Sequence, residues 1–359
     1  MSKKIVLTGG GTAGHVTPNI ALIPHLKNAG FEISYIGSYD GIEKKLIADF
    51  PDVPYMGIAT GKFRRYFDVK NFTDPFRVIK GYTEAKRFLK KISPDIVFSK
   101  GGFVSVPVVR AAASLNIPCI IHESDMTPGL ANKIAIPKAT KVCCNFPETL
   151  NNLPEGKAIV TGTPIRKDLF EGNAANAMTY CGFTEVKPTL LIIGGSTGSV
   201  RINEAIWSCL DELTKTYNII HLCGKEKTNE QYNNVKGYVQ YEYIKKELSD
   251  MLALADVVVS RAGANVICEL LALRKPSVLI PLSLEASRGD QILNAKSFSN
   301  SGYAKLLMEE DVTNTSLLEA INEVYNNHDS YIEAMNNSSA TDAITMIADL
   351  LDEAIESNK

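Results

Sequence analysis

The chain contains 359 residues, a length that exceeds one ordinary hydrophobic core and suits two domains of α/β size. Its composition, 45% hydrophobic and 22% charged, is that of a globular protein, and the sequence has no run of about eighteen apolar residues. The first residues lead directly into a short apolar run, which is not the pattern of a signal peptide. We therefore expect a protein that stays in the cytosol.

Charge is distributed unevenly along the chain, although the net charge is only −2. Residues 1–165 carry 21 Lys and Arg against 13 Asp and Glu, a net charge of +8, which leaves −10 for residues 166–359. Ten basic residues and seven aromatic residues are interleaved within residues 62–91. This segment suits an anionic membrane surface, where each Lys or Arg contributes roughly 1 kcal/mol. A solvated helix face with ordinary core aromatics fits it as well, while the acidic remainder argues against nucleic acid.

Cysteine usage predicts a reduced interior. The seven cysteines are an odd number, show no C-x-x-C spacing and lie mostly in apolar surroundings. Cys143 and Cys144 fall within a short apolar run that is typical of a strand. We therefore expect free thiols in the core and no metal site built from them.

The loop at residues 8–15, Thr-Gly-Gly-Gly-Thr-Ala-Gly-His, follows an apolar run and precedes a helical stretch. Glycines allow backbone amides at a helix start to approach an anion, so the loop predicts a phosphate-bearing ligand. Gly9, Gly11 and Gly14 also satisfy G-x-G-x-x-G, which suits a nicotinamide or flavin cofactor, and a ligand-free turn is a further alternative. His15 favours chemistry, since an imidazole at this position can act as a general base.

Short apolar runs alternate with helix-length spacers through the first half, which predicts a parallel sheet covered on both faces. The expected strands are residues 4–8, 32–36, 95–99, 118–122, 141–144 and 158–161. Two strand ends open into loops, residues 99–107 and 122–133, and we expect both at the same edge of the sheet as the glycine loop. His122 and Glu123 stand at the second of these ends, either as catalytic groups or as a hydrogen-bonded pair that fixes the loop.

The pattern restarts after residue 166, which predicts a second Rossmann-like half. Its expected strands are residues 189–193, 218–223, 238–243, 256–260, 277–280 and 304–308, and its expected helices lie near 264–273, 290–300, 314–326 and 340–356. Another glycine loop, Gly-Gly-Ser-Thr-Gly-Ser at residues 194–199, follows the first of these strands. We place the boundary between residues 163 and 164, with a second domain of residues 164–344. The last helix is amphipathic and is expected to pack back on the first domain through residues 345–359.

The segment Arg261 to Glu269 is the richest candidate site of the second half. It reads as a strand end, a small-residue turn and the first turns of a helix. Small residues leave room for a diphosphate at the helix start, and the carboxylate of Glu269 can accept hydrogen bonds from ribose hydroxyls. The alternative is an Ala- and Gly-rich helix that packs closely on the sheet and leaves Glu269 exposed.

These motifs occur in the order and spacing of one family. They are Gly10-Gly11-Thr12-Ala13-Gly14-His15, Ser99-Lys100-Gly101-Gly102, His122-Glu123, Gly162-Thr163-Pro164-Ile165-Arg166, Gly194-Gly195-Ser196 and Arg261 to Glu269. Over essentially its whole length the chain resembles the bacterial peptidoglycan glycosyltransferases that add N-acetylglucosamine to undecaprenyl-diphospho-muramoylpentapeptide, converting lipid I to lipid II. Ser287 to Gln291 and the basic insert at 62–91 are similar to the Gram-positive branch.

The resemblance implies an α/β fold of two Rossmann-like domains facing a cleft, the GT-B fold. The N-terminal half would hold the lipid acceptor at the cytoplasmic face of the membrane, and the C-terminal half would hold UDP-N-acetylglucosamine. The residues that it implies for the donor are Thr12, Ala13, Gly14, Arg166, Ser196, Ile244, Ala264, Asn265, Glu269 and Gln291. Asp125 would contact sugar hydroxyls, but it stands where many members have Asn and cannot donate a hydrogen bond when ionised.

The implied reaction inverts the anomeric centre in one step, which needs one general base. His15 is the leading candidate, followed by Glu123 and Asp125. The sequence has no D-x-D, so helix amides and Arg166 would stabilise the leaving diphosphate and no metal or cofactor is expected. Other cell-wall synthesis proteins are candidate partners of a peripheral membrane enzyme.

Three alternatives remain open at this point. A related UDP-sugar transferase that acts on diacylglycerol would share the fold and the membrane patch. A nicotinamide-dependent oxidoreductase would use the G-x-G-x-x-G pattern, but it leaves the segment at residues 261–269 unexplained. A non-catalytic nucleotide-sugar-binding subunit would bind UDP without turnover.

Overall fold

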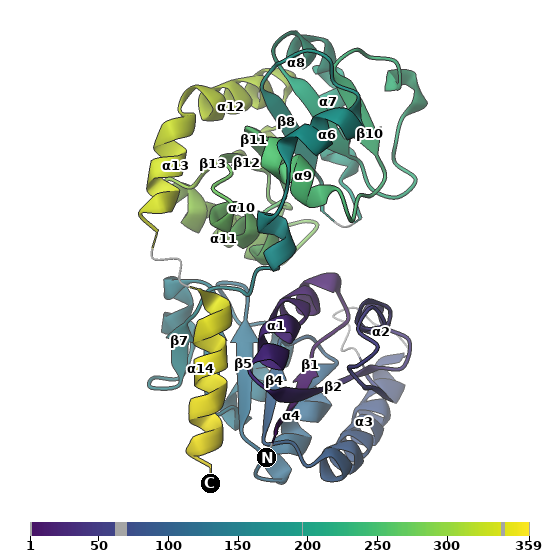
Figure 1. Cartoon of the computed structure of the whole chain (residues 1–359), viewed down its shortest axis with the longest axis vertical. Helices are drawn as coiled ribbons and strands as arrows, with labels where there is room; N and C mark the ends of the chain where they lie inside the picture. Colours follow the sequence, from purple (N-terminus) through teal and green to yellow (C-terminus); the bar gives the residue numbers. More distant parts are fainter. Residues whose placement is uncertain (1, 62–69, 196, 339–341, 359) are drawn as a thin grey trace. The chain divides into compact units, whose positions relative to one another are not determined.

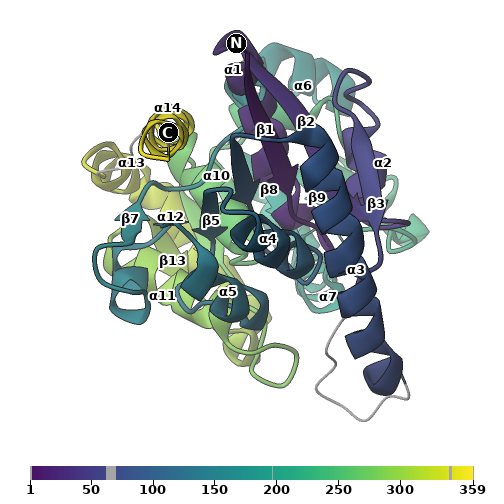
Figure 2. The ribbon, with the colours of Figure 1, turned by 90° about the horizontal axis from the view of Figure 1, so that it is seen from below.

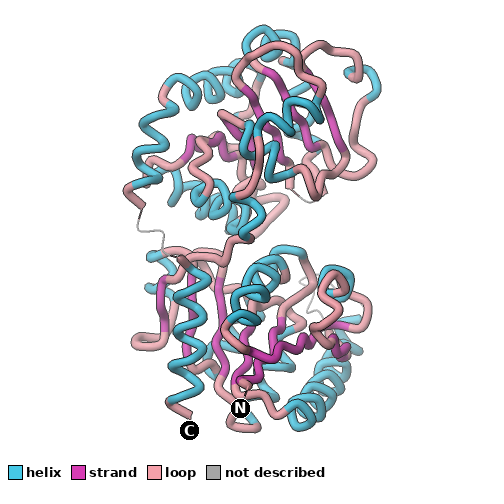
Figure 3. Tube along the Cα trace, in the orientation of Figure 1, coloured by secondary structure: helices cyan, strands magenta, loops and turns pink. Residues whose placement is uncertain are grey.

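A computed structural model describes residues 2–61, 70–195, 197–338 and 342–358, and of residues 70–75 it describes only the helical backbone. The chain divides into two compact units (Figure 1). The first comprises residues 1–166 and 340–359, and the second comprises residues 167–339. In both units strands alternate with helices along the chain (Figure 3).

The first unit contains a seven-stranded parallel sheet in the order β3-β2-β1-β4-β5-β6-β7. The strands are β1 (Lys3–Thr8), β2 (Phe31–Ser38), β3 (Tyr55–Ile58), β4 (Ile96–Ser99), β5 (Cys119–Glu123), β6 (Lys141–Cys144) and β7 (Ala158–Val160). Strand order reverses at β1, whose Leu7 pairs with Tyr35 on one side and Phe98 on the other. Such a reversal point is where open parallel sheets bind ligands.

Helices cover both faces of this sheet because successive strand residues point to opposite sides. The helices of the first unit are α1 (Thr17–Asn28), α2 (Ile42–Ile47), α3 (Lys70–Ile92), α4 (Ser105–Ser114), α5 (Leu130–Ala135) and α14 (Ala343–Glu356). Ile5 and Leu7 pack with α1 and α14, whereas Val6 packs with α3 and α4 on the other face. Helices α3 and α4 lie side by side (Figure 2). The C-terminal helix α14 thus completes one layer of the first unit, through Ile347 and Leu351.

The second unit contains a six-stranded parallel sheet in the order β10-β9-β8-β11-β12-β13. Its strands are β8 (Thr189–Ile193), β9 (Asn218–Leu222), β10 (Tyr238–Tyr241), β11 (Val257–Ser260), β12 (Ser277–Leu279) and β13 (Ala304–Leu306). Its helices are α6 (Ala174–Cys181), α7 (Val200–Ser208), α8 (Leu210–Thr216), α9 (Leu248–Leu254), α10 (Ala264–Ala272), α11 (Asp290–Asn300), α12 (Asn314–Asn326) and α13 (His328–Asn336). Leu190, Ile192 and Val259 pack with α7, α8 and α12 on one face. The intervening Leu191 and Val258 are buried as well.

Strand β3 and helix α6 are among the elements that the sequence pattern does not predict. Strand β3 is only four residues long and contains Gly57, which weakens the strand pattern. Helix α6 lies in a stretch without a clear hydrophobic period, and it is defined instead by its ends. Asn173 caps its N-terminus by accepting hydrogen bonds from two backbone amides, and Gly182 ends it in the left-handed conformation at φ 67°.

Among the described residues, no helix is both long and apolar enough to span a bilayer.

Candidate active site

Three loops of the first unit meet at the carboxyl edge of its sheet. They follow β1, β4 and β5, which are hydrogen-bonded neighbours in the order β1-β4-β5. The loops contain the glycine sequence at residues 9–14, the second glycine turn at residues 100–103 and the segment at residues 124–129. The structure therefore brings together the three loops that the sequence assigns to one edge.

Buried polar side chains fix the glycine loop from beneath. The Tyr35 hydroxyl donates to the Gly9 carbonyl (2.7 Å), and the Asn19 amide donates to the Thr8 carbonyl (3.1 Å). Glu43, which is fully buried, accepts from the Gly11 amide (3.2 Å) and from the Ser38 amide (2.9 Å). A buried carboxylate that accepts several N–H donors holds the backbone in one conformation.

The two glycine turns pack against each other with no room for side chains. A Cβ atom on Gly102 would lie 2.3 Å from the Gly10 carbonyl oxygen and 3.1 Å from Nδ1 of His15. A Cβ atom on Gly11 would lie 2.5 Å from the Phe103 ring. Gly11 and Gly102 also have φ values of 86° and 78°, which glycine adopts at little cost. Glycine is therefore required here by close approach as well as by conformation.

His15 lies in a short 3₁₀ turn, Ala13–His15, rather than in the α-helix itself, which begins at Thr17. Its Nδ1 is 3.0 Å from the Thr12 hydroxyl. The imidazole is half-buried, whereas Thr12 and Gly14 are exposed. The ring thus lies on the partly exposed side of the loop.

Glu123 is turned into its own loop. The carboxylate is 4% exposed and accepts from the amides of Ser124 (2.8 Å), Asp125 (3.1 Å) and Gly129 (3.1 Å), and from the Asn132 side chain (2.8 Å). Burial raises the pKa of this carboxyl, and the hydrogen bonds from Asn132 and the backbone oppose that rise. The carboxylate thus fixes the backbone of the loop after β5 through partners other than His122. Asp125 is half-buried in the loop that Glu123 holds.

His122 forms its hydrogen bonds with residues other than Glu123. Lys100 donates from Nζ to Nδ1 of His122 (2.7 Å), and Nε2 of His122 lies 2.8 Å from the Gly162 carbonyl. Because Lys100 can only donate and a carbonyl can only accept, the ring is neutral with its proton on Nε2. Lys100 also donates to the Ser124 hydroxyl. This buried chain ties the second glycine turn to the segment that leaves the first unit.

The buried His122 predicts a pH-dependent stability. Burial and the Lys100 ammonium lower the pKa of His122 well below its usual 6.5. The stabilisation of the folded state by the neutral ring is therefore complete above about pH 6.5, and it is lost as the pH falls. His122→Gln keeps a donor and an acceptor but cannot titrate. We expect the free energy of unfolding of wild type, relative to this variant, to fall by about 1 kcal/mol between pH 6.5 and 5.5. Equal pH slopes in denaturant titrations of the two proteins would contradict this.

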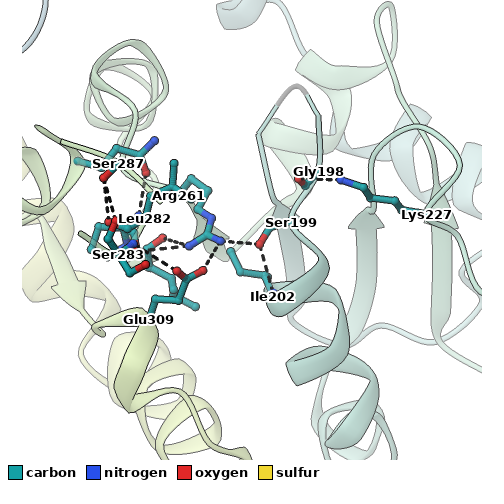
Figure 4. Close-up of polar contacts among 12 residues, drawn as sticks. Gly198, Ser199, Ile202, Lys227, Arg261, Leu282, Ser283, Ser287 and Glu309 are labelled. Carbon is teal, nitrogen blue, oxygen red and sulfur yellow. Dashed lines mark hydrogen bonds and ion pairs between the residues drawn. The ribbon is translucent and has the colours of Figure 1, made fainter. Parts of the chain in front are cut away.

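The second unit has a corresponding edge at the carboxyl ends of β8, β11 and β12. The loop after β8 is held by Lys227, which donates to the carbonyls of Thr197 (2.7 Å) and Gly198 (3.3 Å) (Figure 4). Gly198 leaves no room for a Cβ atom, which would lie 1.9 Å from the Cys223 carbonyl oxygen. Asn294 donates to the Ala262 carbonyl (3.2 Å) and so fixes the turn before α10.

The residues of this unit that are predicted to bind the donor sugar nucleotide lie on α10, in the loop after β10 and in the first turn of α11. Ala264, Asn265 and Glu269 lie on α10; Ala264 is buried and the other two are half-buried. Ile244 is buried in the loop after β10. Gln291, in the first turn of α11, accepts from the Leu282 amide through Oε1 (3.1 Å), and its NH₂ group is the part of the side chain that can donate.

Two further predicted residues lie elsewhere. Ser196 is outside the described residues. Arg166 is the last residue of the first unit's main segment, so by its contacts it belongs with the first sheet. It is half-buried.

Several residues that build these edges were not predicted as site residues. Glu43 and Asn294 are buried polar side chains within otherwise ordinary segments, and their roles depend on contacts with loops far away in the sequence. The glycines at positions 37 and 41 are a signal that could have drawn attention to Glu43, since a Cβ atom at either would overlap its side chain. In the described part of the chain, His, Cys, Asp and Glu side chains form no cluster of three that could hold a metal ion.

Comparison with known proteins agrees with this architecture. Residues 5–144 match the glycosyltransferase family 28 N-terminal domain, and residues 189–351 match the glycosyltransferase family 28 C-terminal domain. The crystal structure of Acinetobacter baumannii MurG superposes with a TM-score of 0.77 at 25% identity, covering 98% of this chain and 99% of that one. The structure of a kitacinnamycin glycosyltransferase also superposes with a TM-score of 0.77, at 14% identity, covering 99% of this chain and 100% of that one. The fold is that of a two-domain GT-B glycosyltransferase, as predicted.

Two bacterial relatives show which family of glycosyltransferases the chain belongs to. A UDP-N-acetylglucosamine–N-acetylmuramyl-(pentapeptide) pyrophosphoryl-undecaprenol N-acetylglucosamine transferase of Lachnoclostridium phytofermentans is 62% identical over 98% of this chain and 99% of the relative. The enzyme of the same name from Lachnospira eligens is 60% identical over 97% and 98%. The chain belongs to this family of N-acetylglucosamine transferases.

Proposed function

We propose that the chain transfers N-acetylglucosamine from UDP-N-acetylglucosamine to the muramoyl 4-hydroxyl of undecaprenyl-diphospho-muramoylpentapeptide, with inversion at the anomeric carbon. The observation that carries this proposal is the 62% identity, over nearly the full length, to an enzyme named for that transfer. The muramoyl hydroxyl attacks, its proton passes to a base, and UDP leaves. Because the α-linked donor becomes a β-linked product in one displacement, no covalent enzyme intermediate is required.

The first unit supplies the acceptor site and the base in this proposal. His15 is the base best supported by the geometry, because its ring is half-buried at the open side of the glycine loop. Asp125 is the second candidate. Glu123 is assigned a positioning role instead, since both of its oxygens already accept hydrogen bonds within the loop.

The second unit supplies the donor site. The glycine loop after β8 and the N-terminus of α10 are suited to the diphosphate, because their amides and the helix dipole favour negative charge. Glu269 would accept hydrogen bonds from the ribose, and the backbone at Ile244 would contact the uracil. Gln291 would donate from its NH₂ group to an oxygen of the sugar, and Arg166 is retained as a proposed contact of the diphosphate.

Helix α3 supports a peripheral position at the cytoplasmic face of the membrane. Phe76 and Ile79 are 75% and 63% exposed, and Arg77 and Lys80 are exposed beside them. A groove of about 460 Å³ lies next to this surface, lined by Val78, Ile79, Tyr82, Arg110, Lys138 and neighbouring residues of α4. Apolar side chains surrounded by basic ones suit insertion into an anionic bilayer.

Ile79→Glu tests the membrane proposal. We expect the variant to lose roughly tenfold or more in partitioning onto vesicles with anionic phospholipid, since a buried apolar side chain contributes about 1.5–3 kcal/mol. Val186 is 98% exposed in the second unit, so Val186→Glu is the matched control and should bind as wild type does. Cosedimentation at low and high salt measures both. An equal loss of vesicle binding in the two variants, or vesicle binding that does not change with salt, would argue against α3 as the segment that contacts the membrane.

The reaction itself is tested by UDP release from UDP-N-acetylglucosamine with a panel of acceptors. We expect release with a lipid I analogue and none with diacylglycerol or without an acceptor. Release with diacylglycerol alone would favour the related lipid transferase. UDP binding with no release from either acceptor would favour the binding subunit, and NADH binding in place of UDP would favour the oxidoreductase.

A further inference from the structure

A buried ion pair joins four separate segments at the carboxyl edge of the second sheet. Arg261, directly after β11, and Glu309, in a short 3₁₀ turn after β13, are only 8% and 5% exposed. Nη2 of Arg261 contacts Oε1 of Glu309, and the same nitrogen donates to the Ser199 hydroxyl (2.6 Å). Figure 4 shows the two side chains between the loop after β8 and the loop after β12.

The remaining groups of the pair reach the loop after β12. Nη1 of Arg261 donates to the carbonyls of Ile280 (3.1 Å) and Pro281 (3.3 Å). Oε2 of Glu309 accepts from the Ser283 amide (3.2 Å). Burial opposes ionisation of Glu309, but Arg261, the Ser283 amide and Arg201 together outweigh it and lower the pKa of the carboxyl. The pair is thus charged, and its hydrogen bonds satisfy it in a buried setting.

The connected loops are those that the proposed donor site uses. Ser199 caps α7, where its hydroxyl accepts from the Ile202 amide (3.3 Å), and it ends the glycine loop that follows β8. The loop after β12 carries Leu282, whose amide orients Gln291. One guanidinium therefore sets the distance between the glycine loop proposed for the diphosphate and the side chain proposed for the sugar.

We propose that Arg261 and Glu309 are positioning residues that hold these two loops in register for the donor nucleotide sugar, with Ser199 as the contact on the diphosphate side. The inference rests on the proposed function. A planar guanidinium is needed because a Lys ammonium cannot reach carbonyls, hydroxyl and carboxylate in four directions at once. Glu309→Gln would replace one carboxylate oxygen with an NH₂ group. That group would face either the Arg261 guanidinium or the Ser283 amide, and both of these are donors.

Arg261→Lys and Glu309→Gln test this by separating donor from acceptor parameters. We expect each to raise the Kd for UDP and the KM for UDP-N-acetylglucosamine by about 10- to 100-fold, as loss of charge-assisted hydrogen bonds implies, with the acceptor KM within about twofold. The matched control is Glu323→Gln, which breaks the exposed ion pair of Glu323 with Lys305 (2.6 Å) in the same unit and should change none of these values.

Ser199 provides a milder variant if the charge substitutions do not fold. Ser199→Ala removes one contact of Arg261 and should raise the Kd for UDP by about three- to tenfold, and Ser199→Thr, which keeps the hydroxyl, should restore it. A lower melting temperature with an unchanged Kd for UDP, measured by calorimetry where every variant is folded, would overturn the proposal and leave the pair a purely structural one. Failure of the wild type itself to bind UDP would instead contradict the proposed function.

Discussion

His15→Ala should lower kcat by about 10²- to 10⁴-fold, the contribution of a positioned general base, while the KM for UDP-N-acetylglucosamine changes only a few-fold. The ring is half-buried beside Thr12, whose hydroxyl lies 3.0 Å from Nδ1, and it is not one of the buried core residues. Steady-state UDP release with a lipid I analogue measures the effect. Thr12→Ala, which removes the hydroxyl beside Nδ1 but leaves the imidazole in place, should lower kcat much less.

His25→Gln is the matched control, because His25 lies on α1, the helix that follows His15, and is also half-buried. It should retain wild-type kcat. If His15→Ala keeps more than a tenth of the wild-type kcat while Asp125→Asn loses about 10²-fold or more, the base is Asp125 and the assignment of His15 is wrong.

Of the methyl groups that could be added to the glycine turns of the first unit, the one in Gly102→Ala should disrupt the carboxyl edge of the sheet most. Its Cβ atom would lie 2.3 Å from the Gly10 carbonyl oxygen, so the two glycine turns must separate. We expect a loss of at least tenfold in kcat/KM for the acceptor, and a loss of about 1–3 kcal/mol in the free energy of unfolding beyond the cost of φ alone. Denaturant titration and acceptor kinetics measure the two effects.

Gly156→Ala separates the two causes. Gly156 has a φ of 74°, close to the 78° of Gly102, but a Cβ atom there would meet nothing within 4 Å. It should therefore show only the conformational cost, about 1–2 kcal/mol, with kcat/KM unchanged. If the two variants behave alike, the close approach of the glycine turns has no bearing on activity.

The sheets could be predicted from sequence because their strands are short, β-branched and bounded by glycine, proline or polar residues. Strands β6 and β8, for example, have the predicted bounds at Lys141–Cys144 and Thr189–Ile193. The expectation that three loops of the first half share one edge follows from parallel topology alone, and the structure confirms it. Strand β3 escaped because Gly57 interrupts its short pattern.

The supporting side chains could not be predicted, because their partners lie far away in the chain. Glu43 contacts Gly11 at a separation of 32 residues, and Arg261 contacts Glu309 at a separation of 48. Nothing local distinguishes such a Glu from one on the surface. His122 and Glu123 show the reverse case, in which a conspicuous pair was predicted as either catalytic or mutually bonded. The two side chains are not bonded to each other: His122 contacts the Gly162 carbonyl, and Glu123 accepts from the Gly129 amide.

The proposed reaction is a single displacement that inverts the donor's anomeric carbon, and the configuration of the product is the clearest evidence for or against it. We would incubate the protein with UDP-N-acetylglucosamine and a lipid I analogue and determine the anomeric coupling of the new linkage by proton NMR. We expect a β-linked disaccharide. An α-linked product would contradict this expectation, since retention requires a different mechanism from one base and one displacement.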